Sequence, residues 1–287
     1  MVFLAVLIAV TTHRGITMYK SSALIAWILI AVPVAGVHAA EKPVVAVIGT
    51  GDMGDSLGPR FAQLGYRVVY GSRDPESEKV QALVRSTGAG ASAATPPEAA
   101  QQGDIVLMVV PWPAMEKVAQ SLGDVAGKIV VDVSMPFEQG ADGYPQKMVE
   151  TSSAEMIQAF NPGARVVKAW ATLGSQVIDY INVVGGPISI PLASNDRQAK
   201  ETVAKIVSAM GFDPVDFGPL RMAREIETLQ MIYMIPLVQA RDQSWEFYFR
   251  RSNHWACQEP EGWYDPVYDS KELAQLPRTQ GEPQPCP

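Results

Sequence analysis

The sequence predicts a doubly wound α/β fold, with a parallel sheet covered by helices on both faces, of the Rossmann nucleotide-binding type. From Val44 onward, short apolar runs alternate with amphipathic stretches, the order expected of successive βα units. The runs at Asp104–Val110 and Lys128–Val133 are almost continuously apolar, which is typical of parallel strands buried on both faces. A glycine-rich segment, 49–54, directly follows the first apolar run and precedes a helical pattern, as in dinucleotide-binding units.

The individual elements follow from hydrophobic period and capping residues. Thr95 precedes two prolines and predicts the start of a helix, because threonine caps helices and proline suits their first turn. Pro59 falls inside the first expected helix, where it removes a hydrogen bond and predicts a kink. Strands are expected at Val44–Ile48, Arg67–Tyr70, Ala89–Ser92, Asp104–Val110, Lys128–Val133, Arg165–Trp170, Ile188–Leu192 and Pro214–Phe217. Helices are expected from the glycine segment to about Gly65, at Pro75–Ser86, from Thr95, and at Ser152–Phe160, Asn195–Met210 and Arg221–Gln239.

The first 39 residues have the pattern of a secretory signal peptide. Lys20 precedes the apolar run Ala23–Val37, and compact residues lead to a cleavage site after Ala39. The alternative is an uncleaved membrane anchor, and both alternatives export the remaining chain to the periplasm or the exterior. Residues 40–240 are then expected to form the nucleotide-binding domain, and residues 241–287 an aromatic-rich tail that is not a second domain.

Composition excludes several classes of function. The 287 residues carry a net charge of −7, which argues against a general nucleic-acid binder. Without the leader, His254 is the only histidine and the cysteines are Cys257 and Cys286, too few for common zinc sites or a Ser–His mechanism. No metal site is therefore expected. The two cysteines either form a disulfide that holds the tail or remain unrelated thiols.

The glycine segment predicts a pyrophosphate site. It reads Gly49-Thr50-Gly51-Asp52-Met53-Gly54, a G-x-G-x-x-G pattern between a strand and a helix. The first glycine permits the tight turn, the second lets the backbone approach the pyrophosphate, and the third lets the helix pack on the strand. The alternative is a structural glycine turn in a fold that binds no nucleotide.

The end of the second strand favours NADP(H) over NAD. Dinucleotide sites for NAD place a carboxylate here to bind the ribose hydroxyls. This chain instead has Ser72 and Arg73, and its first carboxylate is Asp74. A hydroxyl and a guanidinium suit a 2′-phosphate, because arginine pairs with phosphate through two parallel hydrogen bonds. The alternative is an exposed arginine in a turn.

These residues resemble the deazaflavin (coenzyme F-420)-dependent NADP oxidoreductases and the related N-terminal reductase domain of the STEAP metalloreductases. The resemblance also rests on Val110-Pro111-Trp112, Val166–Trp170, Pro214–Leu220 and Ala223–Glu227. It implies that NADP(H) exchanges hydride with a flavin or deazaflavin, with onward transfer of electrons to a metal as a further option. It places Val110, Pro111 and Trp112 beside the nicotinamide, and Thr172 and Ser175 where they complete the cleft.

The function expected is thus that of an NADPH-dependent oxidoreductase with a small-molecule redox acceptor. The alternative is an exported binding protein that keeps the fold as a scaffold without catalysis. No catalytic residue is assigned, because hydride transfer needs geometry and exclusion of water more than acid–base help. Lys168 and Tyr180 are the nearest proton donors, and both are expected to be structural or solvated. The helix 221–239 is apolar on a broad face and suggests a homodimer.

Overall fold

The computed structural model describes residues 42–183, 185–242 and 244–249, all within the unit Glu41–Pro287. The expected leader lies outside these residues, as do His254, Cys257, Cys286 and the later aromatic residues of the tail. Among the helices of the described part, none is long and apolar enough to cross a membrane.

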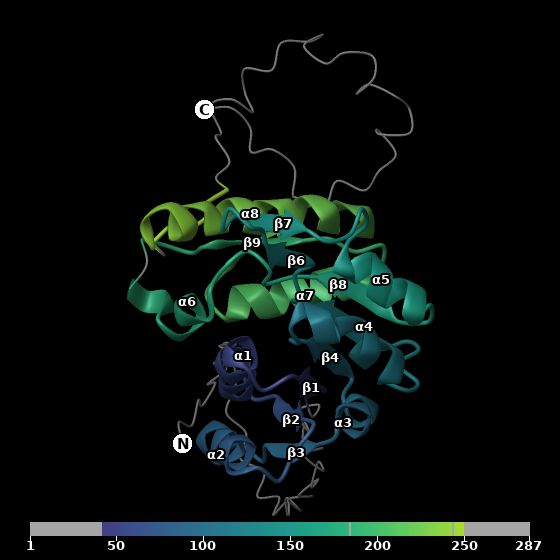
Figure 1. Cartoon of the computed structure of the whole chain (residues 1–287). Coiled ribbons are helices and arrows are strands. Elements are labelled where there is room, and N and C mark those ends of the chain that lie inside the picture. The colour runs from purple at the N-terminus through teal and green to yellow at the C-terminus, as the bar shows by residue number, and fades with distance from the viewer. Residues whose placement is uncertain (1–41, 184, 243, 250–287) are drawn as a thin grey trace, which may run out of the picture. The chain divides into compact units, whose positions relative to one another are not determined.

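Six parallel strands form the central sheet, in the order β3-β2-β1-β4-β5-β8 (Figure 1). This order, with the first strand in the middle, is that of a doubly wound sheet and agrees with the predicted fold class. The strands are β1 (Val44–Ile48), β2 (Arg67–Gly71), β3 (Ser92–Ala94), β4 (Ile105–Met108), β5 (Ile129–Asp132) and β8 (Arg165–Lys168).

Helices cover both faces of this sheet, because alternate strand residues point to opposite sides. Val47 and Leu107 pack in one core with residues of α1, α2, α6 and α7, whereas Ile48 and Met108 pack in the other with residues of α3, α4 and α5. The helices are α1 (Asp52–Gln63), α2 (Glu78–Thr87), α3 (Pro96–Gln102), α4 (Trp112–Ser121), α5 (Ser153–Phe160), α6 (Ser175–Asp179), α7 (Arg197–Ala209) and α8 (Ala223–Ala240).

Helix α1 continues through Pro59 and packs closely on the sheet. A Cβ atom at Gly58 would lie 2.0 Å from the hydroxyl oxygen of Tyr70 on β2, so only glycine allows this approach. The predicted start of α3 is confirmed, because Thr95 and Glu98 form a capping box.

Four of the strands in the described part of the chain lie outside the central sheet. β9 (Ser189–Leu192) pairs in parallel with β10 (Asp213–Asp216) as a separate sheet, so these two predicted strands do not extend the sheet of six. An isolated bridge between Lys168 and Ala193 joins β8 to this pair. β6 (Phe137–Gln139) and β7 (Pro145–Lys147) form an antiparallel hairpin that the sequence did not predict.

Residues 244–249 of the tail return onto the domain without forming a helix or strand. The carbonyl oxygen of Phe247 accepts a hydrogen bond of 3.0 Å from the Ser189 amide, and the Phe249 amide donates to Ser189 Oγ at 2.8 Å. The ring of Phe247 lies 6.1 Å from that of Tyr233, and Phe249 lies 5.4 Å from Phe217. The aromatic residues therefore fix the start of the tail to the domain.

Candidate functional site

A cleft of about 980 Å³ crosses the carboxyl ends of β2, β1, β4 and β5. Ligands bind at this edge in doubly wound sheets, where the direction of the crossovers changes. Its lining is Ile48, Gly49, Thr50, Gly51, Asp52, Met53, Gly71, Ser72, Arg73, Asp74, Ser77, Lys79, Val80, Pro96, Val109, Val110, Pro111, Trp112, Pro113, Ala114, Val118, Val133, Ser134, Met135, Phe137 and Gln230.

The three glycines of the turn have different structural reasons. Gly49 has a φ of +118°, and a Cβ there would lie 2.3 Å from the Val109 carbonyl oxygen. A Cβ at Gly54 would lie 2.1 Å from the Gly49 carbonyl oxygen, and Gly54 is buried beneath the turn rather than in the lining of the cleft.

Gly51 differs, because a Cβ there would have no protein atom within 4 Å. Its position at the start of α1 faces the cleft, where helix amides lack intrahelical acceptors and favour an anion. The absence of a side chain at Gly51 therefore serves no packing need, and the space fits a pyrophosphate.

At the β2 end of the cleft, hydroxyl and cationic side chains come together. Ser72 and Arg73 lie there as the sequence predicts, and Ser77 and Lys79 of the next segment also line it. Arg73 and Lys79 are exposed, and neither forms an ion pair within the described residues. Both cations are therefore available to a phosphate group.

The opposite end of the cleft, at β4 and β5, is mainly apolar. Val110, Pro111 and Trp112 lead from β4 into α4 as predicted. Residues 133–135, which follow β5, form the adjoining wall. An apolar end suits hydride transfer, because water is excluded there.

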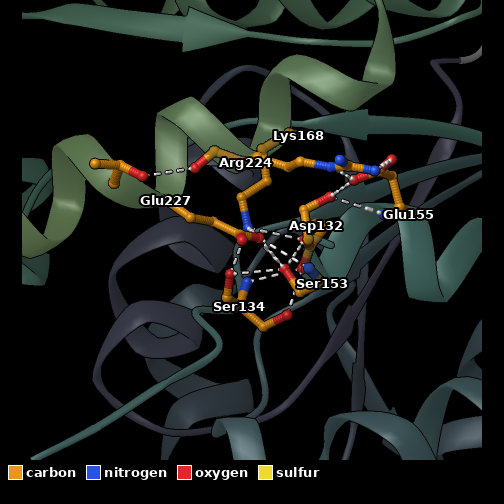
Figure 2. Close-up of polar contacts among 9 residues, drawn as sticks. Asp132, Ser134, Ser153, Glu155, Lys168, Arg224 and Glu227 are labelled. Carbon is orange, nitrogen blue, oxygen red and sulfur yellow. Dashed lines mark hydrogen bonds and ion pairs between the residues drawn. The ribbon is translucent and has the colours of Figure 1, made fainter. Parts of the chain in front are cut away.

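A buried polar cluster lies behind this wall (Figure 2). Lys168 Nζ donates to Asp132 Oδ2 at 2.9 Å, Glu227 Oε1 at 3.0 Å, Ser153 Oγ at 2.8 Å and the Ser134 carbonyl oxygen at 2.5 Å. All five side chains are buried. We call these five residues the Lys168 cluster. It ties β5, β8, α5 and α8 together at one point.

The charges of the cluster perturb one another. Burial disfavours the Lys168 ammonium, but the two carboxylates more than offset this and raise its pKa. Burial raises the pKa of Glu227, against the attraction of Lys168. A further ion pair, between Arg224 and Glu155 at 2.7 Å, joins α8 to α5 beside the cluster.

The two side chains considered as proton donors do not line the cleft. Lys168 is completely buried, and its raised pKa keeps it charged. Tyr180 is 65% exposed at the end of α6. Both therefore have the structural or solvated character expected of them.

Besides Gly54, the predicted site residues Thr172 and Ser175 are absent from the cleft lining. Thr172 is 1% exposed, and Ser175 begins α6. Their neighbour Gly174 lines a second cavity of about 140 Å³, which shares Gln230 with the cleft. The segment thus adjoins the cleft through this cavity.

Sequence reasoning missed Ser134, Met135 and Gln230. The first two follow β5 at the carboxyl edge of the sheet, so the position of a strand end was a usable indication. Gln230 lies in the middle of a largely apolar helix, and no local pattern distinguishes it.

Comparison with known proteins identifies the family. The family model for coenzyme F420-dependent NADP oxidoreductases matches residues 44–136, which include the glycine turn, Ser72-Arg73 and Val110-Pro111-Trp112. The F420-dependent NADP reductase of Methanothermobacter thermautotrophicus is 31% identical over 200 residues, covering 64% of this chain and 85% of that protein. The chain belongs to this family.

Two further relatives support the same conclusion. A crystal structure of a putative F420-dependent NADP reductase from Arthrobacter sp. FB24 superposes with a TM-score of 0.67 and 26% identity, covering 73% of this chain and all of that one. Metalloreductase STEAP3 of Rattus norvegicus is 30% identical over 191 residues, which are 67% of this chain but only 37% of that protein. The chain thus spans little more than a third of the length of the metalloreductase.

Family membership confirms the predicted fold class, the predicted family and the class of enzyme, an NADP-dependent oxidoreductase. The residues present also fit the cofactor, because Gly51 leaves room for a pyrophosphate, and Arg73 and Lys79, which form no ion pair within the described part of the chain, lie at the ribose end.

Proposed function

We propose that this protein oxidises NADPH and passes its hydride to a flavin or deazaflavin. The observation that carries the proposal is the composition of the cleft along its length. It changes from hydroxyls and cations at β2, through the open backbone at Gly51, to an apolar end at β4 and β5. This order matches the phosphate, pyrophosphate and nicotinamide of NADPH.

In this proposal each section of the cleft binds one part of the cofactor. Ser72 and Arg73 hold the 2′-phosphate, since arginine and a hydroxyl both donate to phosphate oxygens. The turn Gly49–Gly54 holds the pyrophosphate against the first amides of α1. Val110-Pro111-Trp112 and the wall at 133–135 enclose the nicotinamide.

Bound NADPH supplies the hydride, and the protein orients the reacting groups and excludes water from them. The apolar end keeps water from the reacting atoms, and the rigid sheet edge fixes the ring of the cofactor. The second cavity lies next to this end and shares Gln230 with it, so the acceptor ring has an approach from that side. The acceptor's balancing proton comes from solvent in this scheme.

The test is a calorimetric titration of the full chain with NADPH and NADH, followed by assays of NADPH oxidation with riboflavin, a deazaflavin and ferric citrate. Tight binding of NADPH, weak binding of NADH and turnover with a flavin-type acceptor are expected. Failure to bind either nucleotide would contradict the proposal and favour a scaffold without catalysis.

We further propose that the chain is exported, on the basis of Lys20, the apolar run 23–37 and the compact residues before Ala40. Cell fractionation with N-terminal sequencing of the isolated protein tests this. A mature N-terminus at Ala40 in the exported fraction is expected, whereas a cytoplasmic protein with an intact leader would contradict it.

A further inference from the structure

Gln230 is a buried amide at the junction of the two cavities. It lines both the β5 end of the cleft and the second cavity, yet it is only 9% exposed. Its side-chain oxygen has no hydrogen-bond partner within the described residues. A buried polar group without a partner is costly, and a water molecule or a polar ligand group in either cavity would supply one.

The Lys168 cluster fixes the helix turn that carries Gln230. Glu227 lies three residues earlier on α8, on the same side of the helix. Its Oε1 atom accepts from Lys168 Nζ at 3.0 Å, from Ser153 Oγ at 2.7 Å and from the Ser153 amide at 2.9 Å. These contacts hold α8 against β8 and α5.

The same cluster fixes the facing wall of the cleft. The Ser134 amide donates to Asp132 Oδ1 at 2.9 Å, and the Ser134 carbonyl oxygen accepts from Lys168. Ser134 and Gln230 line the same cleft. One lysine therefore sets both the wall after β5 and the turn of α8, and Gln230 has a defined position between them.

We propose that the carboxamide of Gln230 pairs with the amide or imide group of the redox-active ring bound at this junction. A carboxamide both donates and accepts, so it complements another carboxamide or an imide through reciprocal N–H···O hydrogen bonds. The nicotinamide carboxamide of NADPH and the pyrimidinedione of a flavin or deazaflavin share this chemistry. The inference rests on the proposed function, and Gln230 acts in it as a binding residue.

The test compares Gln230→Leu with Gln239→Leu, a matched change at an exposed position near the end of the same helix. Three quantities are measured in the full chain: the Kd of NADPH by fluorescence, the Kd of 2′-phospho-ADP-ribose by calorimetry, and the KM of riboflavin. Loss of one good hydrogen bond corresponds to about a 3- to 10-fold increase in the Kd or KM concerned.

A weaker Kd of NADPH in Gln230→Leu, with an unchanged Kd of 2′-phospho-ADP-ribose, assigns the contact to the nicotinamide carboxamide. An unchanged Kd of NADPH with a raised KM of riboflavin assigns it to the acceptor. No change in any quantity would overturn the inference, and so would equal weakening of NADPH and 2′-phospho-ADP-ribose, which indicates a general distortion.

Thermal melting shows whether Gln230→Leu is folded, and Gln230→Asn, which keeps a shortened carboxamide, replaces it if it is not. Gln230→Asn should then show the same selective weakening of NADPH binding or the same rise in the KM of riboflavin. The inference and the proposed function fail separately. Binding of NADPH by the wild type with no effect at Gln230 removes the inference only, whereas a wild type that binds no nucleotide removes both.

Discussion

At the scale of single residues, two glycines of the same turn have opposite roles. Gly54 is required by packing, because its Cβ would meet the Gly49 carbonyl oxygen at 2.1 Å, whereas Gly51 has open space and an ordinary φ of −83°. Gly51→Ala should therefore leave the melting temperature unchanged and weaken NADPH binding by about 1–3 kcal/mol through steric intrusion.

Gly54→Ala is the matched control, and it should lower the melting temperature because backbone must move. Differential scanning calorimetry and NADPH titration of both variants check the pair. Normal NADPH binding by a folded Gly51→Ala would contradict the assignment of the pyrophosphate to this turn.

Arg73 decides the preference for NADP(H) in our proposal. A charge-assisted hydrogen bond contributes about 1.5–3 kcal/mol, so Arg73→Ala should weaken NADPH binding about 10- to 150-fold and leave NADH binding unchanged. Because Arg73 is exposed, the difference should shrink at high salt. Calorimetric titration at two ionic strengths measures this. Equal weakening of both nucleotides would place the 2′-phosphate elsewhere.

At the scale of secondary-structure elements, the Lys168 cluster holds two strands and two helices together. Lys168→Met would leave the Asp132 and Glu227 carboxylates buried without a cation, and removal of one partner of a buried pair costs about 3–5 kcal/mol. Urea unfolding at pH 7 should show a decrease of this size in the free energy of unfolding. The loss should be smaller at pH 5, because burial raises the pKa of Glu227 and its carboxyl takes up a proton there more readily.

Lys200→Met is the matched control. Lys200 is also paired, with Asp216 at 2.6 Å and the Gly218 carbonyl oxygen at 2.9 Å, but the two side chains are 9% and 13% exposed, so this ion pair is less deeply buried, and it lies outside the cleft lining. Lys200→Met should lower the free energy of unfolding by less than Lys168→Met does, and it should leave NADPH binding unchanged. Equal losses in the two variants would contradict a special role for the Lys168 cluster.

The tail segment 244–249 should be attached to the domain in a pH-dependent way. Burial raises the pKa of Glu246 to about 7, although the nearby Tyr233 hydroxyl acts in the opposite direction. The docked segment therefore favours the protonated carboxyl, and its stability should fall as the pH rises from the ordinary glutamate pKa to about 7. The Phe249 amide, which donates to Ser189, reports the docking.

Hydrogen exchange of that amide, corrected for the intrinsic rate, should show better protection at pH 5.5 than at pH 8. Glu246→Gln should remove the difference, because the amide does not titrate. A pH dependence that persists in Glu246→Gln would assign the effect to another group.

At the scale of the whole molecule, we propose that two copies pair through α8. Ile232 on this helix is 42% exposed, and Leu229 and Ile235 beside it are only partly buried. An isologous contact would cover this apolar surface. Sedimentation velocity should give a two-chain mass for the wild type and a one-chain mass for Ile232→Glu. Tyr180→Glu, a change at another exposed large residue, should have no effect. A monomeric wild type would contradict the proposal.

Much of the fold could be predicted because its rules are local. β1 occupies Val44–Ile48 as predicted, and Thr95 caps α3 through Glu98. The hairpin of β6 and β7 was missed, since each strand has three residues and no clear alternation. The separate pairing of β9 and β10 was also missed, because a strand pattern does not say which strand is its neighbour.

Local sequence patterns were sufficient to predict the strands of the sheet, the glycine turn and the residues at the ends of β2 and β4. These depend on period, steric freedom and order along the chain, which are local properties. The contact of Lys168 with Glu227, 59 residues away, and the place of Gln230 in the lining of the cleft depend on tertiary packing instead. Packing brings such residues together. A buried polar atom needs a hydrogen-bond partner, and that partner can lie far away along the chain, where local sequence patterns give no information about it.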